Sequence, residues 1–189
     1  MLHDFKNGLG PAPAHHHKNS NGSLGGWVAE TAYVAPTAYV GENAKVYGHA
    51  QVYDQAMIHG FAQIFGQAKI FGQAQVYSQA WVCGKAWVYD QAQVYDQAYI
   101  RGQAQVFNNV HINKKMHIDM ITKIESQDDV IYGEMKFEGK LLPYTIYQDV
   151  ENVIWIWFAG WCKTLEEWKS HKSWSLVHQQ FVKFLDSVN

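Results

Sequence analysis

Histidine and cysteine are the residues of this chain best suited to metal binding or acid–base chemistry, so their spacing is considered first. Three histidines are consecutive, His15, His16 and His17, in a segment rich in Gly, Pro and Asn. Such a run could bind a metal adventitiously or be a remnant of cloning. Cys83 and Cys162 lie in different regions. Two cysteines support neither a disulfide framework nor a four-ligand zinc site, so we expect no metal and no cofactor.

Aromatic side chains are the candidates for binding chemistry. The chain contains 8 Trp, 11 Tyr and 9 Phe, whereas only 17% of its residues are charged. This ratio is unusual for a protein that must stay soluble, so we expect some of these rings to face another subunit or a partner. The candidates for a binding surface or subunit interface are Tyr53, Phe71, Trp81, Trp87, Tyr89 and Phe107.

The charge distribution disfavours two classes of partner. The formal net charge is −2, and Lys and Arg do not cluster. The chain therefore lacks the basic footprint that nucleic acids and anionic membranes require, and we expect neither as a partner. No apolar run approaches the ~18–20 residues of a membrane span, and the N-terminal residues lack the apolar core of a signal peptide. We expect a cytoplasmic protein.

A six-residue repeat organises the first part of the chain. Val or Ile occupies every sixth position from Val28 to Ile112, and Ala stands two residues earlier from Ala32 to Ala104. This period suits short strands that turn a corner after every hexad and stack on the previous coil. Three hexads close one triangular turn, with Val or Ile inside and Gly, Asp, Asn or Ser at the corners.

Side chains on either side of each buried Val or Ile should point outward, because strand side chains alternate. Stacking every eighteenth residue places Tyr53, Phe71, Tyr89 and Phe107 on one face together with Trp87, and Trp81 on another face. Stacked rings can stabilise a sheet by themselves. Alternatively, at least one face packs between subunits. One corner column is formed by Gly48, Gly66, Gly84 and Gly102, which indicates either corner geometry or close approach of another backbone.

The consensus x-A-x-(V/I)-(aromatic)-(G/D), as in QAQVYD, resembles the hexapeptide-repeat family of left-handed β-helices over residues 27–113. This resemblance implies a left-handed parallel β-helix of about five coils. It also implies a homotrimer about an axis parallel to the prism. The fold class expected is thus mainly β, with the β-helix followed by a small α+β domain.

The resemblance also raises two enzyme hypotheses. Many proteins with this repeat are acyltransferases that use acetyl-CoA or an acyl-carrier thioester, a basic histidine and a loop that interrupts the coils. In this chain the candidate base is His59, and no insertion interrupts the hexads. A carbonic-anhydrase-like zinc site would need three histidines from neighbouring subunits, and His111 and His117 are the nearest pair.

The segments outside the repeat are expected to differ from it. Residues 1–26 should form an extended or disordered lead-in. Residues 114–189 should form a small α+β domain, with strands in MHIDMITKI, VIYGEMKF, LLPYTIYQD and NVIWIWFAG. Thr164 can cap a helix whose first turn carries Glu166 and Glu167, and SLVHQQFVKFL has helical spacing. The stretch AGWCKTLEEWKSH resembles the tail of short hexapeptide-array proteins of phages and prophages.

The expected function is that of a non-enzymatic homotrimer that displays binding surfaces. The phage-like resemblance suggests a protein in the host cytoplasm that binds a host protein or sequesters a small nucleotide. The alternative is the acyltransferase that uses His59.

Overall fold

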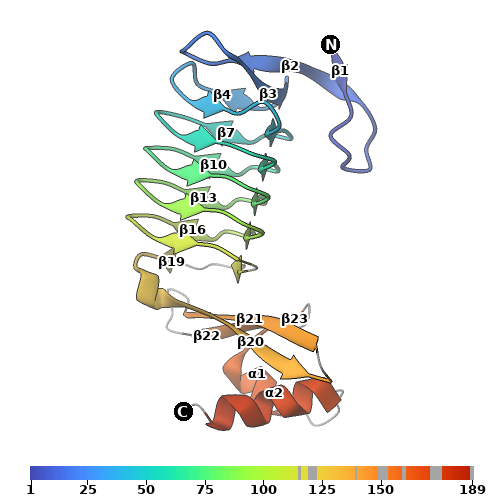
Figure 1. The fold of residues 1–189 in the computed structure, drawn as a ribbon, viewed down its shortest axis with the longest axis vertical. Helices are drawn as coiled ribbons and strands as arrows, with labels where there is room; N and C mark the ends of the chain where they lie inside the picture. Colours follow the sequence, from blue (N-terminus) through green and yellow to red (C-terminus); the bar gives the residue numbers. More distant parts are fainter. Residues whose placement is uncertain are drawn as a thin grey trace.

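The protein is mainly β, with a long repetitive part and a small C-terminal layer (Figure 1). The computed structural model describes residues 1–114, 116–118, 123–138, 140–148, 153–158, 161–170 and 176–187. Over these residues it consists of a parallel β-helix of about five turns, followed by a sheet and two short α-helices. The fold class expected from the sequence is confirmed.

Three parallel ladders form the three sides of the β-helix, and we call them faces 1, 2 and 3. Face 1 contains β3 (Leu24–Ala29), β6 (Lys45–Val46), β9 (Gln63–Ile64), β12 (Trp81–Val82), β15 (Tyr99–Ile100) and β18 (His117–Ile118). Face 2 contains β4 (Tyr33–Val34), β7 (Gln51–Val52), β10 (Lys69–Ile70), β13 (Trp87–Val88), β16 (Gln105–Val106) and β19 (Lys123–Ile124). Face 3 contains β5 (Tyr39–Val40), β8 (Met57–Ile58), β11 (Gln75–Val76), β14 (Gln93–Val94) and β17 (His111–Ile112).

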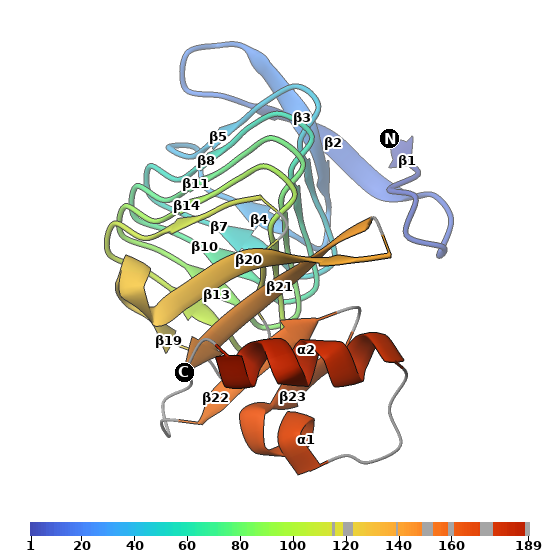
Figure 2. The same cartoon turned by 60° about the horizontal axis from the view of Figure 1, so that its bottom comes forward.

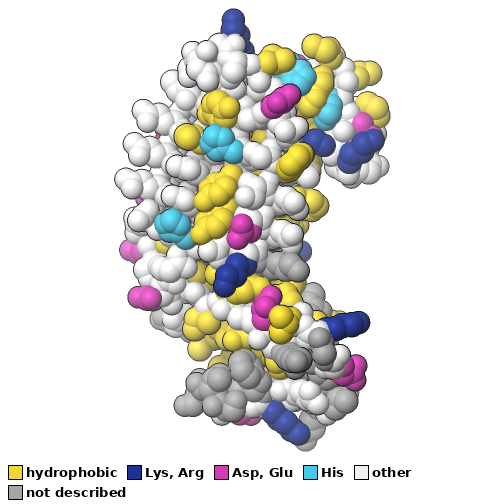
Figure 3. All heavy atoms as spheres, viewed as in Figure 1, with side chains coloured by type: hydrophobic (Ala, Val, Ile, Leu, Met, Phe, Trp, Pro, Cys, Tyr) yellow, Lys and Arg dark blue, Asp and Glu magenta, His cyan; other side chains and the backbone are white. Residues whose placement is uncertain are grey.

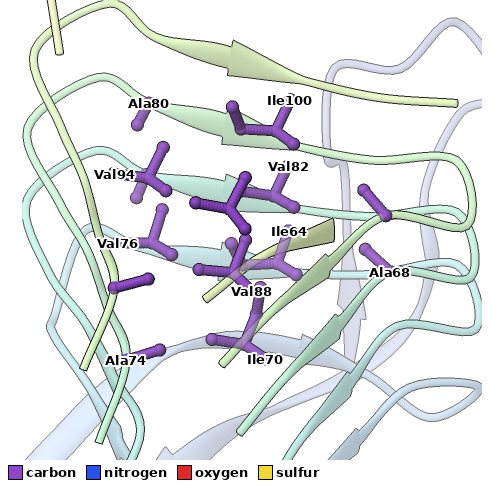
Figure 4. Close-up of a cluster of buried hydrophobic side chains, with 14 of the residues drawn as sticks. Ile64, Ala68, Ile70, Ala74, Val76, Ala80, Val82, Val88, Val94 and Ile100 are labelled. Atoms are coloured by element: carbon purple, nitrogen blue, oxygen red, sulfur yellow. The ribbon is translucent and has the colours of Figure 1, made fainter. Parts of the chain in front are cut away.

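Aliphatic side chains fill the interior of the coils. Each short strand directs its second residue inward, and these Val and Ile residues are fully buried from Val40 to Ile124. The Ala residues from Ala38 to Ala104 are buried with them, and Figure 4 shows both sets pointing into the same interior. Because Ala occupies little space, the chain can turn the corner while larger side chains from other faces fill the centre.

The corners use backbone conformations with positive φ, which favour Gly, Asp and Asn. At Gly84, with φ of +68°, an added Cβ would lie 2.9 Å from the carbonyl oxygen of Gly102. The close approach at the glycine column is therefore to the next coil of the same chain. Asp54, with φ of 55°, accepts a hydrogen bond from the backbone N–H of Gly72 at 3.0 Å. The hydrogen bond to the next coil thus compensates for the unfavourable positive φ at an aspartate corner.

The ladders continue beyond Asn113, where the hexad pattern had been expected to end. β18 pairs with β15, and β19 pairs with β16, in the same parallel register as the earlier coils. The strand expected over 116–124 is therefore replaced, in its described residues, by two coil strands; residues 119–122 lie outside the described part. A short run of alternating apolar and polar residues fits either one ordinary strand or two hexads, which explains why a single strand was expected over 116–124.

The N-terminal segment forms an ordered, extended arm across the top of the coils (Figure 1). β1 (Leu2–His3) and β2 (Ala12–Lys18) extend face 1 with antiparallel pairing, and β2 covers the free edge of β3. The buried side-chain amide of Asn19 donates to the carbonyl oxygen of Val40 at 3.1 Å and accepts from its N–H at 2.9 Å. The arm therefore caps exposed strand edges on two faces, which edge strands require.

The three consecutive histidines belong to this arm and make separate contacts. His15 Nδ1 lies 2.8 Å from Glu30 Oε1, whereas the His16 ring packs on Trp27 with centroids 3.9 Å apart. His17 is buried, with Nε2 3.2 Å from the carbonyl oxygen of Ala38. Within the described residues there is no cluster of three side chains that could hold a metal ion. These histidines make structural contacts of the cap.

Acidification is expected to loosen the arm. Burial lowers the pKa of both His3 and His17 below the ordinary value, and the charge of Lys45 adds to this effect at His3. The unfolded arm therefore binds more protons than the folded arm once the pH falls below about 6.5. The cap loses stability as the pH falls below this value, and it has its full stability at higher pH. Hydrogen exchange should show weaker protection of β2 amides at pH 5 than at pH 7.5, after correction for intrinsic rates. Equal protection at both values would contradict this coupling, and amides of β9 and β12 serve as the control.

An antiparallel sheet follows the last coil after a short 3₁₀ turn, η1 (Gln127–Asp129). Its strands, in spatial order, are β20 (Val130–Phe137), β21 (Lys140–Gln148), β22 (Ile154–Phe158) and β23 (Trp161–Thr164). The helices are α1 (Leu165–Ser170) and α2 (Leu176–Ser187). The expected strands over VIYGEMKF, LLPYTIYQD and NVIWIWFAG are confirmed in their described parts, and so are both helices.

The C-terminal sheet has apolar side chains on both sides. Val130 and Tyr147 belong to the core of the β-helix, so this side of the sheet closes the bottom of the coils. Ile156 and Phe158 form a second core with residues of α1 and α2, which lie on the outer side of the sheet (Figure 2). The sheet is therefore a middle layer between the coils and the helices.

The start of α1 carries the cap that its sequence indicates. The Thr164 hydroxyl accepts from the N–H of Glu167 at 3.1 Å, and the Glu167 carboxylate accepts from the N–H of Thr164 at 2.9 Å. This reciprocal pair is a capping box. Neither α1 nor α2, as far as the chain is described, has the length and apolarity needed to cross a membrane.

Candidate functional site: a groove between the coils and the C-terminal sheet

Five of the six aromatic residues proposed from the sequence share face 2. Phe71, Tyr89 and Phe107 stack almost in parallel, with successive ring centroids 4.8 and 4.9 Å apart. Trp87 meets Phe71 edge-on at 6.3 Å and is 37% exposed, whereas Phe107 is only 8% exposed. The stacked rings therefore hide much of their own surface, and Trp87 is the more accessible apolar group. The fifth residue, Tyr53, packs against Tyr33 at 5.3 Å.

The sixth residue, Trp81, lies on face 1 and is 43% exposed. Its ring contacts Phe65 and Tyr99 edge-on, with interplanar angles of 78° and 72°. By contrast, Tyr47 and Phe65 higher on the same face stack at 2° and cover each other's ring faces. Neither neighbour of Trp81 stacks on the indole in this way. Trp81 therefore differs from Phe71, Tyr89 and Phe107 of face 2, whose rings stack on one another.

His59, the candidate base of the acyltransferase hypothesis, lies beside face 3. Its ring packs against Tyr39 with centroids 4.9 Å apart. Burial lowers the pKa of the imidazole, and no neighbouring charge contributes to this shift. A general base near neutral pH benefits from the opposite arrangement, in which a carboxylate orients the ring and favours its protonated form. The surroundings of His59 do not provide that arrangement.

His111 and His117, the pair considered for a zinc site, lie on different faces. His111 is in β17 of face 3, whereas His117 is in β18 of face 1. The His117 ring stacks in parallel on Trp157 of β22 at 3.7 Å. The fold thus directs the two imidazoles to different sides of one chain, and it uses His117 to join the coils to the C-terminal sheet.

Two neighbouring cavities lie beside the corner between faces 3 and 1, near the start of the C-terminal sheet. One, of about 500 Å³, is lined by Ser78, Gln79, Asp96, Gln97, Lys114, Tyr132 and Glu134. The other, of about 400 Å³, is lined by Gln79, Trp81, Gln97, Ala98, Tyr99 and His117. Because Gln79 and Gln97 line both, we treat the two cavities as one feature, the junction groove. Its size is typical of small-molecule sites, which often occur where structural units meet.

The polar side of the junction groove is organised around two carboxylates. The Tyr132 hydroxyl donates to Glu134 Oε1 at 3.0 Å, and the Lys114 ammonium lies 5.0 Å from the centre of the Tyr132 ring. Asp96 Oδ2 accepts from the backbone N–H of Lys114 at 3.1 Å. Burial, with a further contribution from Glu134, raises the pKa of Tyr132 to about 12, so its phenol is neutral at physiological pH. Both carboxylates keep unused acceptor capacity.

The aromatic side of the junction groove has a neutral phenol with a guanidinium beside it. Burial is the main cause that raises the pKa of Tyr99 to about 12, and the Cys83 thiol lies 3.5 Å from its hydroxyl. The Arg101 guanidinium lies 5.6 Å from the centre of the Tyr99 ring. More generally, Figure 3 shows one side of the β-helix on which charged side chains are few and uncharged ones predominate.

Of the residues that line the junction groove, the sequence pointed to Trp81 as an aromatic binding candidate and to His117 only as a possible zinc ligand. The recurrence of Gln79 and Gln97 was visible in the repeat, but repetition alone does not distinguish a stacked scaffold amide from a ligand contact. Tyr132 and Glu134 could not be placed there, because they reach the groove only through the packing of β20 against the coils.

Comparison with known proteins gives no relative from which a function could be transferred. No family model matches the chain, and neither the curated proteins nor the solved structures contain a match. The function must therefore be argued from the geometry described above.

Proposed function

We propose that this chain is a non-enzymatic binding protein whose β-helix is a rigid platform and which assembles as a homotrimer. The proposal depends chiefly on the regular coils combined with the exposed indole of Trp87. Strands begin at every sixth residue from Tyr33 to Lys123, so over the described residues of the coils no loop projects to enclose an acceptor. Exposed tryptophan on a rigid face is typical of an interface.

Face 2 is the surface through which the copies would meet. Trp87 and Tyr33 expose apolar area there, and the stacked column of Phe71, Tyr89 and Phe107 lies beside Trp87. A flat ladder of short strands can repeat the same contacts in each copy about a common axis. The resemblance to hexapeptide-repeat proteins, which commonly form trimers, supports the same assembly. The junction groove lies on a different part of the surface and would remain open.

The mass of the protein in solution tests this assembly. Light scattering should return three times the 21.6 kDa of the single chain. Replacing Trp87 with Glu should shift the mass to that of the monomer, because a charge would then be desolvated in the interface. The control is Phe61→Glu, since Phe61 is exposed at the corner between faces 3 and 1 and should tolerate charge without dissociation. A monomeric unsubstituted chain would contradict the trimer.

A thermal-shift measurement tests the absence of acyltransferase function. Acetyl-CoA at millimolar concentration should leave the melting temperature unchanged, because the uninterrupted coils provide no loop for an acceptor pocket and His59 has no orienting charge. A stabilisation that disappears in His59→Ala would instead support the enzyme and overturn the proposal.

A further inference from the structure

We infer that the junction groove binds an uncharged saccharide. The inference rests on the proposed function as a binding protein and assigns the class of ligand that this groove would take. Three features of the groove support it: an exposed indole, a pair of amides shared by both cavities, and, in the cavity that holds Asp96 and Glu134, a balance of charge that disfavours anions.

The exposed indole provides the apolar part of the recognition. Pyranose rings have faces rich in C–H groups, and such faces pack against the flat surface of an aromatic ring. Trp81 is 43% exposed, and both aromatic neighbours meet it edge-on, at centroid distances of 6.1 and 5.9 Å. The neutral phenol of Tyr99 continues the same wall toward His117. The wall therefore offers a platform without a charge on its principal rings.

The shared amides provide the polar part. Each hydroxyl of a sugar both donates and accepts hydrogen bonds, so its site must offer both kinds of group. Gln79 and Gln97 each carry two N–H donors and a carbonyl acceptor, and they stand beside Trp81 in one cavity and beside Asp96 in the other. The Asp96 and Glu134 carboxylates supply further acceptors, and the Ser78 hydroxyl supplies both roles.

The charge of the groove argues against the other ligand classes. In the cavity lined by Asp96 and Glu134, two carboxylates face one ammonium, that of Lys114, so the field in that cavity opposes a phosphate or nucleotide. Arg101 lies over the Tyr99 ring, but it is not among the residues that line either cavity, where it could bind such an anion directly. A cationic ligand would compete with Lys114, which already lies over the Tyr132 ring. A neutral, hydroxyl-rich ligand is the class that meets neither obstacle.

Calorimetric titration of the full chain tests the assignment. The probes are neutral trisaccharides built from glucose, galactose, mannose or N-acetylglucosamine, and ADP is the anionic comparison. At least one trisaccharide should bind, and ADP should not. Trp81→Ala should weaken binding by about tenfold to a hundredfold, the range expected when one stacking ring is removed. Gln97→Ala, a milder change at the surface, should also weaken binding. The matched control is Trp161→Ala, because Trp161 is an exposed tryptophan outside the groove.

The outcomes separate this inference from the proposed assembly. The inference is overturned if none of the trisaccharides binds, if ADP binds instead, or if Trp161→Ala weakens binding as much as Trp81→Ala. The mass of the chain is measured on the same samples. A trimer that binds no trisaccharide contradicts the ligand assignment alone, whereas a monomer that binds one contradicts the trimer alone.

Discussion

Replacing Trp168 with alanine is expected to lower the free energy of unfolding of the C-terminal layer by about 3–5 kcal/mol, the range for removing a buried large aromatic side chain. Trp168 is fully buried between the sheet and the helices. Its ring meets Phe158 at 6.0 Å and Phe181 at 5.6 Å, and its Nε1–H donates to the carbonyl oxygen of Ile156 at 3.1 Å. The substitution removes both the packing and that donor.

The effect should be local to the layer built on β20–β23. Denaturant unfolding followed by near-ultraviolet circular dichroism should reveal an early transition in Trp168→Ala, with the coils unfolding later. Trp161→Ala is the control, because Trp161 is 57% exposed in the same layer and its truncation should cost less than about 1 kcal/mol. Equal losses in the two variants would show that burial of Trp168 does not hold the layer together.

Replacing Ile58 with alanine is expected to cost about 2–5 kcal/mol, because it leaves a cavity inside the coils. Ile58 is fully buried in the shared core. Its strand β8 is held between β5 and β11 by backbone pairing, with Ile58 beside Val40 and Val76. Because the coils are fixed on both sides, the surrounding side chains have little freedom to collapse into the space.

Met57→Ala is the matched control for this substitution. Met57 precedes Ile58 in the same strand and has a side chain of similar size, but it points outward and is only half-buried. Its truncation should cost less than about 1 kcal/mol. The midpoints of urea unfolding of the two variants would be compared, which reports their difference in stability as long as their m-values are equal. If both variants lost the same stability, the division between inward and outward positions would be wrong.

The hexad pattern predicted the coils because the physics that forms them is local. Each short strand needs one inward aliphatic residue, and the corners from Gly48 onward need a residue that accepts positive φ, as Gly84 and Asp54 do. These requirements recur at a fixed spacing, so they can be recognised in the sequence. The start of α1 was predictable for the same reason, because Thr164 and Glu167 satisfy each other's backbone groups within a single turn.

The structure at the two ends of the β-helix was harder to predict from the sequence. The residues that cap the top, such as Asn19, are ordinary polar residues whose role depends on a strand edge twenty-one positions away at Val40. At the bottom, Met116 replaces the small Ala of earlier hexads, although the ladder continues through Ile118 and Ile124. In both places the sequence pattern weakens where the contacts become long-range.

By itself, the sequence determined a repetitive β-helix with outward aromatics and a small α+β end, because hexad spacing and helix caps are set by neighbouring residues. The repeat already placed Trp81 and Trp87 on different faces, but only the tertiary structure joined Trp81 to Gln97 and Glu134 through the junction groove. The polar cavity of that groove exists because β20 packs on the last coils. Such packing depends on the shapes of two surfaces, which no local spacing of residues records.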